Sequence, residues 1–259
     1  MAVIIAVLNL KGGSGKTTSA ISLASFYSLK GNKVLAMDLD PKATLTHSLI
    51  DSSETLYKEG LCQAVLEGVQ LPEISLRERF SVSPGGYMIR TLDNADPEKV
   101  RRGFGVLLDR LSKEYDLIIL DLPPYPSELF LCSIRKADRI LIPAKADTAS
   151  MMAAKETVSL VGCLDRTDLL LVQHDPREKH TVAIEEKLRG LFGNAIMNAK
   201  VRRNVNLSES MAVFKSIFEY KPGSPGAKDY EAVAGELYER MIVNFGLSDS
   251  GETDMYENY

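Results

Sequence analysis

Eight residues near the N-terminus have the types and spacing of a phosphate-binding loop. They read Lys11-Gly12-Gly13-Ser14-Gly15-Lys16-Thr17-Thr18. The glycines allow the backbone to turn its N–H groups toward phosphate oxygens, and Lys16 is long enough to reach a β- or γ-phosphate. The Thr17 hydroxyl is a hard oxygen ligand that suits Mg²⁺. The run therefore predicts a site for a nucleotide and Mg²⁺.

The segments on either side of the loop are those that such chemistry requires. Residues Val3–Leu8 form a short, continuous apolar run, which predicts a buried parallel strand. After the loop, four apolar residues between positions 20 and 27 repeat at helical spacing, so we expect a helix from near Thr17 to Gly31. The N-terminus of this helix would add positive potential beside a bound phosphate.

Two further predicted strands end in aspartates. The strand Lys33–Asp38 leads into Asp38-Leu39-Asp40-Pro41, and the apolar run Leu117–Leu120 leads into Asp121-Leu122-Pro123-Pro124. Open parallel sheets bind ligands at the carboxyl ends of their strands, so these carboxylates are expected to face the phosphate loop. A single aspartate at a strand end is often only a turn or helix-cap residue. Two of them at these places beside a phosphate loop are much stronger evidence of a functional site.

Lys11 adds a lysine at the first position of the loop, which a standard Walker A motif does not require. The resulting pattern KGGxGKTT resembles the deviant Walker A motif of the ParA/MinD family of ATPases, at every fixed position. In that family the first lysine crosses a dimer interface to the partner subunit's nucleotide, which implies the same role for Lys11. The resemblance also implies that Asp38 and Asp121 help to hold Mg²⁺ and that Asp40 orients the attacking water.

The family resemblance implies a switch that hydrolyses ATP slowly until a partner protein accelerates it. ATP or ADP and Mg²⁺ are the expected cofactors, and Lys11, Lys16 and Asp40 are the expected catalytic residues. The expected nucleotide-binding residues are Lys11, Gly12, Gly13, Ser14, Gly15, Lys16, Thr17, Thr18, Asp38, Asp121 and Pro123, of which Thr17, Asp38 and Asp121 are the expected metal ligands.

The resemblance extends from Val3 to about Phe245. Residues 173–177 are similar to a family loop with a D-x-R pattern, and residues 201–209 are similar to the family segment IPRNVxLSEA. The chain departs from the family at Lys42, where glutamine is usual, at Tyr125, where serine is common, and at Arg202, where proline is usual. These departures bear on base contacts and on stimulated hydrolysis rather than on phosphate binding.

The length of 259 residues and the regular alternation of strands with helix-length segments predict one α/β domain. We expect a single-domain P-loop NTPase fold over residues 1–245, with a mostly parallel twisted sheet flanked by helices on both faces. Residues 246–259 contain four carboxylates and neither lysine nor arginine, and they are expected to form a disordered acidic tail. The chain has 31 basic and 35 acidic residues, so the part before this tail is formally neutral.

Basic residues gather in two places, and clustering matters more for nucleic-acid binding than net charge. Lys200, Arg202 and Arg203 form one group, and Arg177, Lys179 and His180 form a second. In ParA-type proteins the ATP-bound dimer binds DNA without sequence preference, which makes the first group candidate phosphate contacts. The same residues are equally consistent with an ordinary solvent-exposed surface that binds no DNA. The family further implies a homodimer, association with the nucleoid, a ParB-like partner and a plasmid, chromosome or other cargo.

Several alternatives share the phosphate loop. A MinD-like membrane ATPase would end in a basic amphipathic helix, whereas this chain ends in acidic residues, so we expect no membrane partner. A reductase similar to the nitrogenase iron protein would need paired cluster cysteines, but Cys62, Cys132 and Cys163 are widely spaced and are expected to be reduced, mostly packed thiols. Tyrosine kinases of this fold usually lack the Lys11 equivalent. A non-catalytic nucleotide-dependent scaffold also remains an open alternative.

With no apolar span and no signal peptide, we expect a cytoplasmic protein.

Overall fold

The computed structural model describes residues 1–51 and 60–245. Its centre is an eight-stranded sheet in the order β3-β4-β2-β5-β1-β6-β7-β8. Every neighbouring pair is parallel except β3 and β4, which form an antiparallel edge. The strands are β1 (Val3–Val7), β2 (Val34–Asp38), β3 (Ile74–Arg77), β4 (Phe80–Ser83), β5 (Leu117–Asp121), β6 (Arg139–Lys145), β7 (Thr167–His174) and β8 (Val201–Arg202).

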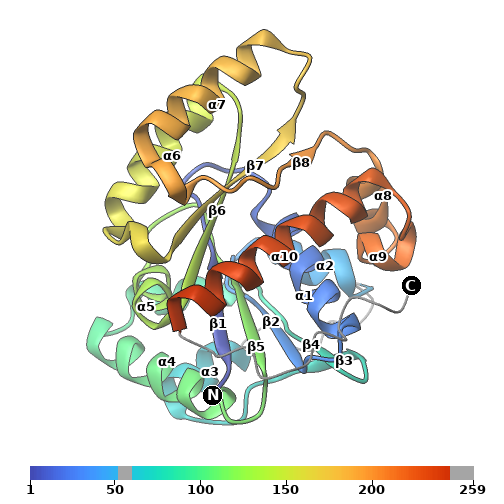
Figure 1. The fold of residues 1–259 in the computed structure, drawn as a ribbon. Coiled ribbons are helices and arrows are strands. Elements are labelled where there is room, and N and C mark those ends of the chain that lie inside the picture. The colour runs from blue at the N-terminus through green and yellow to red at the C-terminus, as the bar shows by residue number, and fades with distance from the viewer. Residues whose placement is uncertain (52–59, 246–259) are drawn as a thin grey trace.

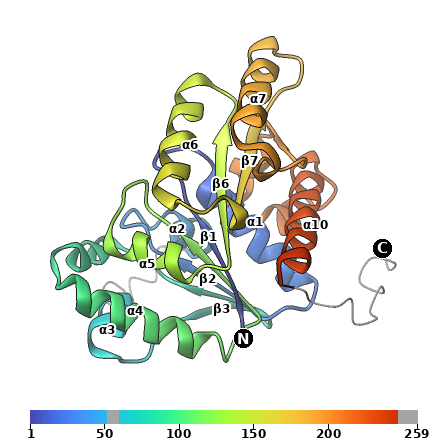
Figure 2. The same cartoon turned by 60° about the vertical axis from the view of Figure 1, so that its left-hand side comes forward.

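Helices cover both faces of this sheet (Figures 1 and 2). One face carries α1 (Lys16–Leu29), α2 (Thr44–Leu49), α8 (Asn206–Ala212), α9 (Ile217–Tyr220) and α10 (Pro225–Phe245). The other carries α3 (Gly60–Glu67), α4 (Pro97–Leu111), α5 (Glu128–Lys136), α6 (Thr148–Val161) and α7 (Lys179–Phe192). Within the described residues, three 3₁₀ segments complete the connections: η1 (Tyr87–Asn94), η2 (Leu164–Arg166) and η3 (Gly193–Ala195).

The central strands are apolar on both sides because each side packs against a helical layer. In β1, Ile4 and Ala6 belong to the core beneath α3, α4 and α5, whereas Ile5 and Val7 belong to the core beneath α1 and α10. All five residues of β5 are buried. Continuous apolar runs are the pattern of strands buried on both faces, so the sequence prediction of a mostly parallel sheet is confirmed.

The predicted elements agree with the structure, with small shifts at their ends. The first helix begins at Lys16 and ends at Leu29, and Gly31 follows with a φ of +94°. The antiparallel pair β3–β4 has no counterpart among the predicted strands, because its short segments carry polar and charged residues. All three cysteines are reduced thiols, and two of them are buried, as expected. The acidic segment 246–259 lies outside the described residues.

Candidate nucleotide-binding site

The phosphate loop lies between the end of β1 and the start of α1, as its sequence predicts. Gly13 and Gly15 adopt positive φ angles of 69° and 94°, which L side chains rarely adopt. A Cβ on Gly15 would also approach Val172 of β7 to 3.2 Å. The loop shape therefore depends on glycine at these two positions.

The N-terminus of α1 has the properties of an anion site. Its N-cap is Gly15, which provides no side-chain hydrogen bond, and its first turn contains no acidic residue. The first N–H groups of a helix have no intrahelical acceptor and need another partner. Positions 12 and 13 also leave open space where a Cβ would stand, so a phosphate can approach the loop backbone.

Lys16 begins this helix and is only 7% exposed. Its Nζ donates a hydrogen bond to the backbone oxygen of Lys11 at 3.3 Å. Burial lowers the pKa of Lys16, and the charges of Asp121 and Asp40 offset part of that effect. The ammonium group is therefore held within the loop, close to both carboxylates.

Asp38 and Asp121 stand side by side because β2 and β5 are neighbours and end at the same level. The two residues are register partners, and each is 1% exposed. Asp38 Oδ2 accepts hydrogen bonds from the Thr46 backbone N–H and hydroxyl, at 2.8 and 2.7 Å. Burial nevertheless raises the pKa of Asp38 to about 6. Burial and the Asp38 charge raise the pKa of Asp121 well above its usual value.

The oxygen atoms at this position fit a divalent metal ion. The Thr17 hydroxyl donates to Asp121 Oδ2 at 2.7 Å, while the buried Asp121 Oδ1 has no hydrogen-bond partner among the described residues. A buried carboxylate oxygen without a hydrogen-bond partner lowers the free energy of unfolding unless a cation or a hydrogen-bond donor binds it. In the part of the chain that the structure describes, no three acidic, histidine or cysteine residues cluster as a complete metal cage. Such a sparse protein ligand set is typical of Mg²⁺ held together with phosphate oxygens.

Asp40 lies beyond the strand end, in the loop that leads to α2. Its backbone N–H donates to Asp38 Oδ1 at 3.2 Å, and its own Oδ1 accepts from the backbone N–H of Lys42 at 2.9 Å. The negative charge of Asp40 raises the pKa of both Lys16 and Asp121. Pro123, two residues after Asp121, is buried and contributes backbone geometry rather than a polar side chain.

Lys11 points away from the phosphate loop in this single chain. Its Nζ lies 3.2 Å from Asp147 Oδ1 and donates to the Ser150 hydroxyl at 2.8 Å. Asp147 is also the N-cap of α6 and accepts from the Ser150 backbone N–H at 2.7 Å. Burial works against ionisation, but the hydrogen bonds from Ser150 and Lys11 lower the pKa of Asp147. This pair of residues was not predicted from the sequence, although an aspartate directly before a helix is a common N-cap.

A cavity of about 570 Å³ opens beside the loop, on the side of β7 and β8. Gly15 and Thr18 line it together with Gln173, Arg203 and Tyr230. Gln173 has a φ of +52°, a strained value for a residue with a side chain. The Thr18 hydroxyl contacts Met211 Sδ at 3.6 Å. This cavity was not predictable from the sequence, because its walls come from four separate segments.

Ion pairs engage two of the three basic residues predicted to contact DNA. Lys200 Nζ lies 2.6 Å from Glu185 Oε1, and Arg202 Nη2 lies 2.6 Å from Asp229 Oδ1. Arg203 is exposed and lines the cavity without an ion pair to any described residue. In the second group, Arg177 pairs with Asp175 at 2.8 Å, while Lys179 and His180 are exposed in the first turn of α7. The structure does not bring these cations together as one free patch.

A glycine loop between a buried strand and an uncapped helix, facing two carboxylates at neighbouring strand ends, defines a P-loop protein. Residues 2–170 match a family model described as an AAA domain. The chromosome-partitioning ATPase Soj of Thermus thermophilus is 32% identical over 247 residues, which cover 92% of this chain and 96% of Soj. The sporulation initiation inhibitor protein Soj of Bacillus subtilis is 27% identical, with 92% of this chain and 98% of that protein covered.

Solved structures agree with these relatives at the level of the fold. A Cyanothece McdA variant in complex with ATP has a TM-score of 0.79 at 20% identity, covering 92% of this chain and 96% of that one. The chain belongs to the ParA-type partition ATPases of the ParA/MinD family. It is accordingly a positioning ATPase of the P-loop class.

Within residues 1–51 and 60–245, no helix combines the length and the hydrophobicity that crossing a bilayer requires.

Proposed function

We propose that this chain binds ATP with Mg²⁺ and hydrolyses it as a slow molecular switch. The main support for the proposal is Asp121 Oδ1, which is buried beside Thr17 and Asp38 and has no hydrogen-bond partner among the described residues. It lies next to a helix N-terminus without a side-chain cap. In this scheme the N–H groups of residues 12–16 and the Lys16 ammonium bind the phosphates. Thr17 and Asp121 would hold Mg²⁺ together with Asp38, and the ion would supply charge neutralisation between phosphate oxygens.

Asp40 is proposed to orient the attacking water. Phosphoryl transfer needs positioning and electrostatic stabilisation more than covalent chemistry, so a carboxylate at the edge of the site suits this role. The nucleoside is proposed to occupy the cavity of about 570 Å³ between the loop and β8. Thr18 and Gln173 on its walls are candidate contacts. The McdA neighbour, whose solved structure is a complex with ATP, supports the nucleotide but not these particular contacts.

The ATP-bound form is proposed to be a homodimer in which Lys11 reaches the partner subunit's nucleotide. Its present contacts with Asp147 and Ser150 would have to break first. Both side chains are about one-third exposed or more, so the ion pair is expected to contribute less than about 1 kcal/mol and to be readily exchanged. Lys11 would then offset charge on the γ-phosphate together with Lys16.

The output is proposed to be non-specific DNA binding by the dimer, with a ParB-like partner accelerating hydrolysis and a plasmid, chromosome or other cargo being positioned. Arg203 is the strongest of the predicted DNA contacts, because Lys200 and Arg202 already pair with carboxylates. A nucleoid location follows if the dimer holds DNA in this way. The relatives named as chromosome-partitioning ATPases support this assignment.

Calorimetric titration with MgATP and measurement of phosphate release, with and without DNA, test the proposal together. We expect micromolar binding that the Lys16→Ala variant loses by at least about 100-fold, which corresponds to about 2.7 kcal/mol. Lys187→Ala, on the outer face of α7, is the matched control. Tight binding without any release of phosphate would instead identify a nucleotide-dependent scaffold, and full binding by the Lys16 variant would contradict the site.

A further inference from the structure

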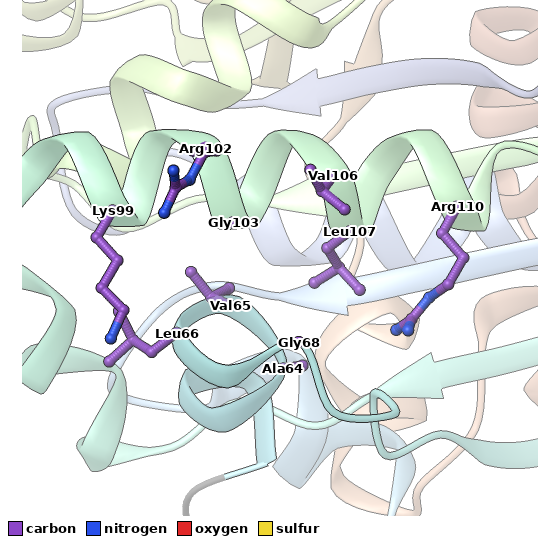
Figure 3. A pocket seen from close by; sticks show the side chains of 10 residues that line it. All are labelled: Ala64, Val65, Leu66, Gly68, Lys99, Arg102, Gly103, Val106, Leu107 and Arg110. Carbon is purple, nitrogen blue, oxygen red and sulfur yellow. The ribbon is translucent and has the colours of Figure 1, made fainter.

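A basic groove lies between α3 and α4, on the opposite side of the sheet from α1 and α10. The hollow has a volume of about 230 Å³, and among the described residues three cations, Lys99, Arg102 and Arg110, line it without any carboxylate (Figure 3). Its floor is apolar and includes Val65 and Leu107. The groove therefore offers both positive charge and apolar surface to an occupant.

The groove is shaped by an unusually close approach of its two helices. A Cβ on Gly103 of α4 would lie 1.8 Å from the Val65 backbone oxygen of α3, so only glycine permits this contact. The neighbouring Val106 is 65% exposed even though it is apolar. Val106 is thus an exposed apolar side chain among cations that form no ion pair with a described residue, which is more typical of a contact surface than of an ordinary solvated helix face.

The cations have little to neutralise them within the described ranges. Neither Lys99 nor Arg102 forms an ion pair there, and Arg110 makes only a 3.4 Å hydrogen bond to the Val69 backbone oxygen. All three are exposed. An acidic segment would thus meet three cations without breaking any ion pair among the described residues.

We propose that the acidic C-terminal segment of the same chain, residues 246–259, binds in this groove. Its sequence contains the carboxylates and the apolar side chains that such an occupant needs. The carboxylates are Asp249, Glu252, Asp254 and Glu257, and the large apolar or aromatic residues are Leu247, Met255, Tyr256 and Tyr259. The rest of the chain is formally neutral, so this segment and the groove are complementary within an otherwise balanced protein.

The path of the chain makes this contact accessible. Met241 and Ile242 of α10 lie against Val3 and Asp116, at the edge of the sheet where β1 and β5 begin. At the same edge the Ala2 N–H donates to the oxygen of Ser112, the residue that follows α4. The groove therefore starts near the end of α10. From Arg110 to Lys99 it runs roughly 16 Å along α4, whereas fourteen extended residues span up to about 48 Å.

Zero-length carbodiimide coupling of the full-length chain tests the proposal, because it joins a carboxylate to a lysine only when they touch. We expect the main tail crosslink within one chain to join Lys99 to Glu252, Asp254 or Glu257, as mapped by mass spectrometry. Its yield should fall at least fivefold in 1 M salt, where the screening length is about 3 Å. Mixing isotope-labelled and unlabelled protein separates crosslinks within a chain from those between chains.

The double variant Arg102→Glu/Arg110→Glu keeps Lys99 as the reporter and should reduce the yield at least fivefold. The matched control, Lys155→Glu/Lys187→Glu, makes the same charge change on exposed sites of α6 and α7 and should leave the yield unchanged. If the arginine variant fails to fold, Asp254→Asn/Glu257→Gln replaces it, since Glu252 can still couple. An unchanged yield in the folded groove variant, or tail crosslinks concentrated on other lysines, would overturn the proposal. Crosslinks found only between chains would assign the groove to a second copy.

Discussion

Asp38→Asn is expected to stabilise the nucleotide-free protein at neutral pH while weakening its site for Mg²⁺. Asp38 is 1% exposed, and burial raises its pKa from 3.8 to about 6. A group whose pKa is higher in the folded than in the unfolded protein makes its full contribution to stability at pH values below the unfolded-state pKa. That contribution is lost as the pH rises through the folded-state pKa. Ionised Asp38 therefore lowers the free energy of unfolding by about 3 kcal/mol at pH 7, but only by about 1 kcal/mol at pH 4.5.

Asparagine removes the buried charge and keeps nearly the same shape. Its carbonyl oxygen can still accept the two hydrogen bonds from Thr46, whereas its amide nitrogen cannot accept the 3.2 Å bond from the Asp40 N–H. Losing that bond costs about 1 kcal/mol. The net stabilisation is thus about 2 kcal/mol at pH 7 and close to zero at pH 4.5.

Urea denaturation in the presence of EDTA, at both pH values, measures this difference. Calorimetry with MgADP should show weaker binding by the variant, so that stability and function change in opposite directions. Asp116→Asn, at the far edge of the sheet, is the control for general effects of removing an aspartate. Equal stability of the two proteins at pH 7, or the same difference at both pH values, would refute the charge-burial argument.

Three further predictions concern catalysis, dimerisation and DNA. Asp40→Ala should permit ATP-dependent dimerisation in sedimentation experiments but reduce phosphate release by at least about 100-fold, and normal turnover would exclude its catalytic role. Asp147→Asn keeps the cap of α6 but removes the charge that holds Lys11. It should tighten ATP-dependent dimerisation by up to about fivefold. Weaker dimerisation would contradict the idea that Asp147 only holds Lys11 back from the dimer interface. Arg203→Glu should weaken ATP-dependent retention on DNA by about tenfold, while Lys187→Glu should not; equal retention would remove Arg203 from the DNA surface.

The phosphate loop was predictable because its chemistry is local. Eight consecutive residues supply the turn, the ammonium group and the helix start, and the flanking apolar runs identify the strand and the helix. The aspartates at the ends of β2 and β5 were recognisable for a similar reason, since a carboxylate after a buried strand of a parallel sheet faces the ligand edge. These patterns were sufficient to predict the fold class and to place the family resemblance.

Long-range pairing decided the remaining features, and a linear pattern does not encode it. Lys11 meets Asp147 only because β6 lies beside β1, and the two residues are 136 positions apart. In the same way Glu185 of α7 and Asp229 of α10 pair with Lys200 and Arg202, which the sequence presented as free cations. The sequence by itself determined which groups are available to bind phosphate. Only the tertiary structure decided which charges neutralise one another, because ion pairing depends on distances that folding alone sets.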